Sequence, residues 1–144
     1  MGVFDKYTTK SKDGAIELSR AKAFGLISRF IYDFEELSSS ILELTLKKFE
    51  ATEILENQSL AEDLETIIIN SSDEIIVSSC IPHFKEEELY PLFAFLVDGA
   101  FSNAEVSKKQ ARRMNVVQET FNISDMASEK IIEIAKLKFG YDPN

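Results

Sequence analysis

The chain of 144 residues has no tryptophan and only one cysteine, one histidine, five glycines and three prolines. Its single thiol, Cys80, excludes an internal disulfide and suits a reducing compartment. No apolar stretch approaches the roughly 20 residues that a membrane-spanning helix needs, so we expect no membrane insertion. The N-terminal residues lack the apolar stretch of a signal peptide, and we therefore expect a cytoplasmic protein.

Basic residues are also scarce, with 16 Lys and Arg against 25 Asp and Glu and a formal net charge of −9. Because such a chain repels polyphosphates, we expect no nucleic-acid partner. The one basic run, Lys108-Lys109-Gln110-Ala111-Arg112-Arg113, lacks interleaved aromatic residues and is typical of a solvated helix face. A hydrophobic content of 44% with eleven phenylalanines indicates a globular domain.

The remaining pattern is helical throughout. Apolar residues recur at helical spacing in successive segments, which lie at about 15–32, 41–49, 59–69, 74–80, 85–98, 102–121 and 124–139. The segment Ile75-Ile76-Val77 is β-branched, but an isolated strand would have no pairing partner, so we favour a helix there. We predict an all-α fold, a compact bundle of six or seven helices. Residues 1–13 are expected to form a flexible arm and residues 14–144 a single domain.

Several helix boundaries are indicated by short motifs. Capping boxes, in which Ser and a Glu three residues later bind each other's backbone N–H, are expected at 59–62, 71–74 and 102–105. Ser124 is expected to cap the last helix and Gly140 to end it. Gly99 is expected to end the helix before it. Pro91 either kinks that helix or lies in the first turn of its second half.

The segment 97–105 is the best candidate for a binding site. Asp98, the Ser102 hydroxyl and Glu105 place oxygen atoms around one turn that contains Gly99. Hard divalent cations such as Ca²⁺ prefer six to eight oxygen ligands, so this turn is a candidate metal site. The spacing of Gly99 and Glu105 matches an EF-hand, but that loop would then have no ligands at its first and third positions. The alternative is structural, with Ser102 and Glu105 forming only a helix cap.

The same residues resemble a known family. The series Val97-Asp98-Gly99, Ser102 and Glu105, together with the opening Val3-Phe4-Asp5-Lys6, resembles the TerB (tellurite resistance) family. This resemblance implies an all-α, TerB-like fold, a role in stress response or scaffolding, and divalent-cation binding at Asp98, Ser102 and Glu105.

TerB domains have two related halves, each with an acidic turn. The resemblance places the first-half turn at residues 32–38, with Asp33 and Glu36 as candidate metal ligands. Phe34 stands where the family has glycine. The family implies a divalent cation, for which Ca²⁺ is one candidate.

The only cysteine and the only histidine, Cys80 and His83, lie close in sequence. They are too few for a zinc site, which needs four ligands, and Cys80 is better interpreted as a small buried residue. We therefore predict no catalytic residues, and a non-enzymatic domain that binds a protein partner. The alternative to a cation-binding scaffold is a metal-free helical adaptor for protein–protein interaction. We expect a monomer or a weak homodimer.

Overall fold

The computed structural model describes residues 16–31, 39–52, 58–102 and 106–140. The arm predicted at residues 1–13 lies outside these ranges. Within them all regular secondary structure is helical, which confirms the all-α fold and the expected helix number. Seven α-helices follow one another: α1 (Arg20–Ile31), α2 (Ser39–Lys48), α3 (Gln58–Asn70), α4 (Asp73–Cys80), α5 (Leu89–Phe101), α6 (Lys108–Thr120) and α7 (Asp125–Phe139). Two short 3-10 turns, η4 (Ile81–His83) and η5 (Glu86–Glu88), join α4 to α5.

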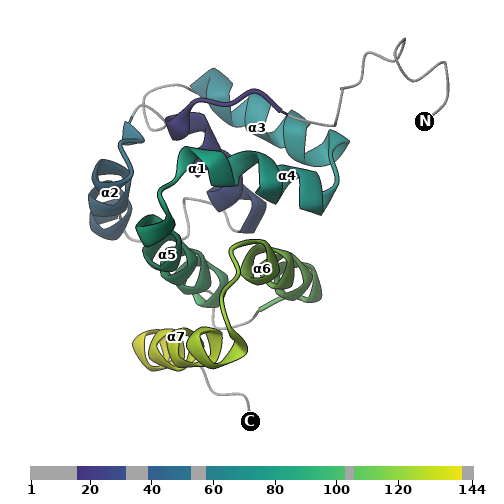
Figure 1. The fold of residues 1–144 in the computed structure, drawn as a ribbon. Coiled ribbons are helices and arrows are strands. Elements are labelled where there is room, and N and C mark those ends of the chain that lie inside the picture. Colours follow the sequence, from purple (N-terminus) through teal and green to yellow (C-terminus); the bar gives the residue numbers. More distant parts are fainter. Residues whose placement is uncertain (1–15, 32–38, 53–57, 103–105, 141–144) are drawn as a thin grey trace, which may run out of the picture.

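Helix α1 is the centre of the bundle. It packs against α3, α4, α5 and α6, whereas α7 lies at the far edge of the molecule and packs mainly on α5 (Figure 1). Nine of the twelve residues of α1 are buried, because apolar or small side chains occupy almost its whole circumference. Buried hydrophobic residues from all seven described α-helices belong to one hydrophobic cluster.

Stacked aromatic rings fill the region between α1, α2 and α5. The ring centroid of Phe24 lies 5.2 Å from that of Phe49 and 5.5 Å from that of Phe95. Phe84 meets Phe49 edge-on at 5.8 Å. Every phenylalanine in the described residues is buried or half-buried. The high phenylalanine content therefore serves core packing in this part of the chain.

A half-buried ion pair at the edge of this aromatic cluster was not predicted from the sequence. The Arg20 guanidinium donates two hydrogen bonds to the Glu88 carboxylate, at 2.9 and 2.6 Å, and one to the His83 carbonyl at 2.8 Å. It also donates to the Phe49 carbonyl at 3.1 Å and lies 5.5 Å from the centroid of the Phe84 ring. These contacts join α1 to the end of α2 and to both 3-10 turns. The hydrogen bonds from Arg20 lower the pKa of Glu88 to about 2.

Several of the predicted helix boundaries are wrong. Ser59 is the second residue of α3 and therefore cannot be its N-cap. The N-cap of α4 is Ser72, whose side chain accepts from the Ile75 N–H, instead of Ser71. Gly99 does not end α5, which continues to Phe101. Helix α6 begins at Lys108 and not near residue 102, because Ser107 caps it in a reciprocal box with Gln110.

Other expectations are confirmed. Residues 73–80 form a helix and not a strand, and Pro91 lies in the first turn of α5. The Ser124 side chain accepts from the Ala127 N–H and caps α7. Gly140 ends α7 in the left-handed conformation, with φ of 63° and its N–H bound to the Lys136 carbonyl.

Candidate functional site

The structure gives two of the predicted metal ligands other partners. Asp98 lies in the last turn of α5, where its Oδ2 accepts a 2.7 Å hydrogen bond from Lys138 Nζ of α7. The Ser102 hydroxyl donates to the Gly99 carbonyl at 2.8 Å, at the C-terminal end of the same helix. The capping box expected between Ser102 and Glu105 does not start α6, since that helix begins at Lys108, six residues after Ser102.

The other three predicted ligands, Asp33, Glu36 and Glu105, lie outside the described residues. Within the described ranges, no three His, Cys, Asp or Glu side chains gather in a way that could hold a metal ion. Asp98 binds a cation of the protein itself, the ammonium group of Lys138. Divalent-cation binding at this turn therefore stays a prediction.

That prediction has a direct test in solution. The TerB resemblance predicts that Ca²⁺ added to the millimolar range shifts the backbone amide signals of residues 98–105 in NMR spectra. Because the Lys138 ammonium competes for the Asp98 carboxylate, a Lys138→Met variant should bind the ion about tenfold more tightly, a gain on the order of 1.4 kcal/mol. Amide signals that stay unchanged in both proteins would eliminate the metal site.

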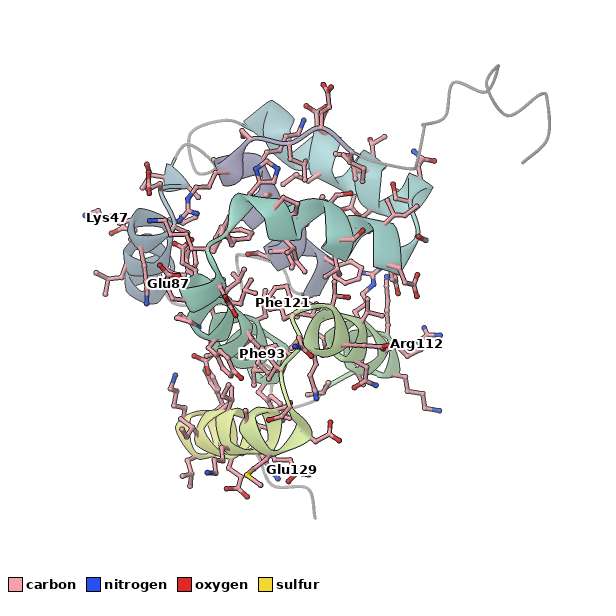
Figure 2. The ribbon with its side chains drawn as sticks, in the orientation of Figure 1. Lys47, Glu87, Phe93, Arg112, Phe121 and Glu129 are labelled. Atoms are coloured by element: carbon pink, nitrogen blue, oxygen red, sulfur yellow. The ribbon has the colours of Figure 1, made fainter. Side chains whose placement is uncertain are left out.

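A different feature lies beside Asp98. Helices α5, α6 and α7 enclose a half-open groove of about 340 Å³, which we call the α5–α7 groove. Eight of its twelve lining residues are apolar: Phe93, Val97, Ala100, Phe101, Val106, Ala111, Met114 and Ile132. Asn115, Gln118, Ser128 and Lys136 supply the polar groups. Figure 2 shows Phe93 pointing from α5 toward the space between the three helices, while Arg112 on α6 and Glu129 on α7 point outward.

The walls of the groove are held at both ends by polar contacts. At the α6–α7 corner, Gln118 Nε2 donates to the Ile123 carbonyl at 3.1 Å and to the Asp125 carboxylate at 2.8 Å. Asn122 takes a left-handed conformation there, with φ of 59°, which asparagine tolerates better than most residues. At the other end the Asp98–Lys138 pair ties α7 to α5. Asp98 thus positions one wall of the groove.

The groove was not anticipated from the sequence. Ser128, Ile132 and Lys136 follow one another at intervals of four residues and line it from α7. That spacing was visible in the sequence, but a polar–apolar–polar stripe of this kind does not mark a site by itself. Ser128 is nearly fully buried, at 3% exposure, so a polar group lies among the apolar side chains of the groove.

The structure also gives the surroundings of the single cysteine and of the basic run at residues 108–113. Cys80 is fully buried, and desolvation raises the pKa of its thiol to about 12, so the thiol stays protonated at neutral pH. In the basic run, Lys108, Lys109 and Arg112 are exposed as expected. Arg113 is not part of the solvated face, because it turns inward over the Phe30 ring at 4.5 Å and donates to the Phe30 carbonyl at 2.8 Å.

Within the described residues, the fold is all-helical and contains a preformed, largely apolar groove between α5, α6 and α7. No family model, curated protein or solved structure matches the chain. Among the described residues, no helix is both long enough and apolar enough to cross a bilayer.

Proposed function

We propose that this chain is a non-enzymatic, TerB-like helical scaffold that binds a protein partner in the α5–α7 groove. The observation that carries this proposal is the apolar lining of a groove open to solvent on one side. Exposed apolar concavities rimmed by polar groups are typical of surfaces that bind other molecules. A role in stress response and the binding of a divalent cation are included in the proposal because of the TerB resemblance alone.

The dimensions of the groove favour a few apolar side chains of a partner helix. A volume of about 340 Å³ accommodates two or three large side chains. An amphipathic helix presents such residues at intervals of three and four and places them into a groove of this kind. The side-chain amides of Asn115 and Gln118 offer donors and acceptors along the α6 wall.

The burial and high pKa of Cys80 remove its thiol as a candidate nucleophile, since a protonated, buried thiol reacts poorly. The pairing of Asp98 with Lys138 supports the metal-free form of the scaffold. In that form Asp98 pairs with Lys138 to hold α7 against α5, and it does not bind a metal ion.

Filling the groove tests the proposal. Ala111 is an exposed residue of α6 that lines the groove, so Ala111→Trp should place an indole ring where a partner would bind. Helical peptides selected against the protein from a random phage-displayed library should shift the NMR amide signals of Ala111, Met114 and Ile132. They should bind the Ala111→Trp variant at least tenfold more weakly, a loss on the order of 1.4 kcal/mol or more.

The matched control is Lys109→Trp, which adds the same ring to an exposed position of α6 outside the groove. Peptide affinity should be unchanged in this variant. The proposal fails if the selected peptides perturb amides away from the groove, or if both tryptophan variants bind them as the unmodified protein does.

A further inference from the structure

The outward face of α7 carries apolar residues that the bundle does not use. Leu137, Met126 and Ile134 are 85%, 69% and 57% exposed, although the opposite face of the helix already packs on α5. Helix α7 lies at the edge of the molecule in Figure 1, and no other described helix covers this face. A helix that is apolar on two faces is usually buried on both. The outward face of α7 therefore lacks a partner within the described residues.

Charge on this face has an ordered arrangement. Four exposed residues follow one another at intervals of four, three and four and so form one stripe: Met126, Lys130, Glu133 and Leu137. The stripe reads apolar, positive, negative, apolar. We call it the α7 stripe. It has the spacing of the seam along which two helices pack against each other.

The α7 stripe is complementary to itself when two copies run antiparallel. Reversing the direction of the second helix about a point between Ile131 and Ile132 places Met126 opposite Leu137 of the second copy. The same operation places Lys130 of each copy opposite Glu133 of the other copy, so each dimer contains two such pairs of opposite charge. A parallel arrangement would instead place Lys130 against Lys130 and Glu133 against Glu133, which is unfavourable.

The charge balance of α7 also favours a second copy over an oppositely charged partner. The chain carries a net charge of −9, but α7 contains three acidic residues and three lysines and is neutral. A strongly basic partner would therefore gain little electrostatic attraction from α7. A surface with the same balance of charge and the same apolar ends fits it better.

We infer that this chain forms a weak, symmetric homodimer through antiparallel packing of α7 along the α7 stripe. One helix face buries less area than the roughly 800 Å² per partner of a standard interface, so we expect a dissociation constant on the order of 10–1000 µM. This dimer is independent of the α5–α7 groove, which opens on another side of α7.

Sedimentation equilibrium of the full chain between about 5 µM and 1 mM tests the inference. The weight-average mass should rise toward that of the dimer with increasing concentration. Leu137→Glu should weaken association at least tenfold, because at each end of the stripe it places a charged carboxylate against the apolar Met126 of the second copy. Leu44→Glu is the matched control, since Leu44 is a comparably exposed leucine of α2, at 70%, and its substitution should leave association unchanged.

Disulfide cross-linking tests the orientation. Under mild oxidation, an equal mixture of Met126→Cys and Leu137→Cys variants should form cross-linked dimers, and either variant alone should form few. Cys80 is fully buried and does not contribute. A constant monomer mass up to 1 mM, equal effects of Leu137→Glu and Leu44→Glu, or efficient cross-linking of each variant alone would overturn the antiparallel dimer. The groove variant Ala111→Trp should dimerise normally, so loss of the dimer and loss of the peptide-binding groove are separate outcomes.

Discussion

Replacing Phe24 by alanine should lower the free energy of unfolding by about 3–5 kcal/mol, the largest effect we expect of any single substitution in this core. Phe24 is fully buried and its ring packs against two others, Phe49 and Phe95. Truncation removes both aromatic contacts and leaves a cavity at the centre of the bundle, where α1 meets its neighbours. A loss of this size is a large fraction of the total stability of about 5–15 kcal/mol that is typical of a domain.

Urea unfolding followed by circular dichroism at 222 nm measures this loss. The control is Leu44→Ala, which truncates a leucine that is 70% exposed and should change stability by less than about 0.5 kcal/mol. A loss below about 1 kcal/mol for Phe24→Ala would show that the three rings do not form the centre of the core.

The position of Phe24 illustrates what the sequence alone determines. Periodicity predicted a helix with a wide aromatic stripe here, because a helix with apolar residues on most of its circumference leaves a strong local pattern. It placed the start of that helix at about residue 15, whereas α1 begins at Arg20. Such a pattern depends on residues within about four positions of each other, so it is visible without tertiary structure. For α4 the choice of helix over strand needed one further argument, that an isolated strand would have no pairing partner.

Helix starts were harder to predict because the capping signal is short and recurs. Ser71 and Ser72 are adjacent, and only the second becomes the cap of α4. Ser102 with Glu105 and Ser107 with Gln110 both satisfy the Ser-x-x-Glu/Gln pattern, five residues apart. The structure uses the second, because α5 continues through Gly99 to Phe101. Misplacing that start made Asp98 and Ser102 appear to face the beginning of a helix, whereas they lie at the end of one.

The candidate site depends on contacts between distant residues, which sequence patterns do not encode. The α5–α7 groove exists because α7 packs on α5 and stands away from α6. Two contacts hold α7 in this position: the hydrogen bond from Gln118 to the Ile123 carbonyl, and the ion pair between Asp98 and Lys138. Asp98 and Lys138 are 40 positions apart in the sequence. Periodicity assigns a residue to a face of its own helix but does not say which other helix that face meets.

The Arg20–Glu88 pair is a contact of the same long-range kind, and its removal should have the second largest effect. Arg20→Met keeps the aliphatic part of the side chain but leaves Glu88 Oε2 and the carbonyl oxygens of Phe49 and His83 without the hydrogen bonds that Arg20 donates. The side chains of Arg20 and Glu88 are only 25% and 18% exposed, so water compensates incompletely. We expect a loss of about 2–3 kcal/mol in the free energy of unfolding, between the values typical of surface and buried ion pairs.

The pair should also make stability depend on pH in a defined direction. The pKa of Glu88 is lowered from an ordinary value of 4.5 to about 2 in the folded protein, so the unfolded chain takes up a proton first as the pH falls. The stabilisation is therefore complete above about pH 4.5 and is lost as the pH falls toward 2. Allowing for solvent screening, its size is about 1–2 kcal/mol.

Comparison with Glu88→Gln isolates this contribution, because glutamine has nearly the same shape and does not titrate in this range. Urea unfolding should show the wild-type protein to be more stable than Glu88→Gln by about 1–2 kcal/mol at pH 6. The difference should become smaller at each lower pH between 4.5 and 2, even though other carboxylates titrate, since those are shared by both proteins. A difference that stays constant over this interval would mean that Arg20 binds Glu88 by shape and hydrogen bonding alone, without a preference for the ionised carboxylate.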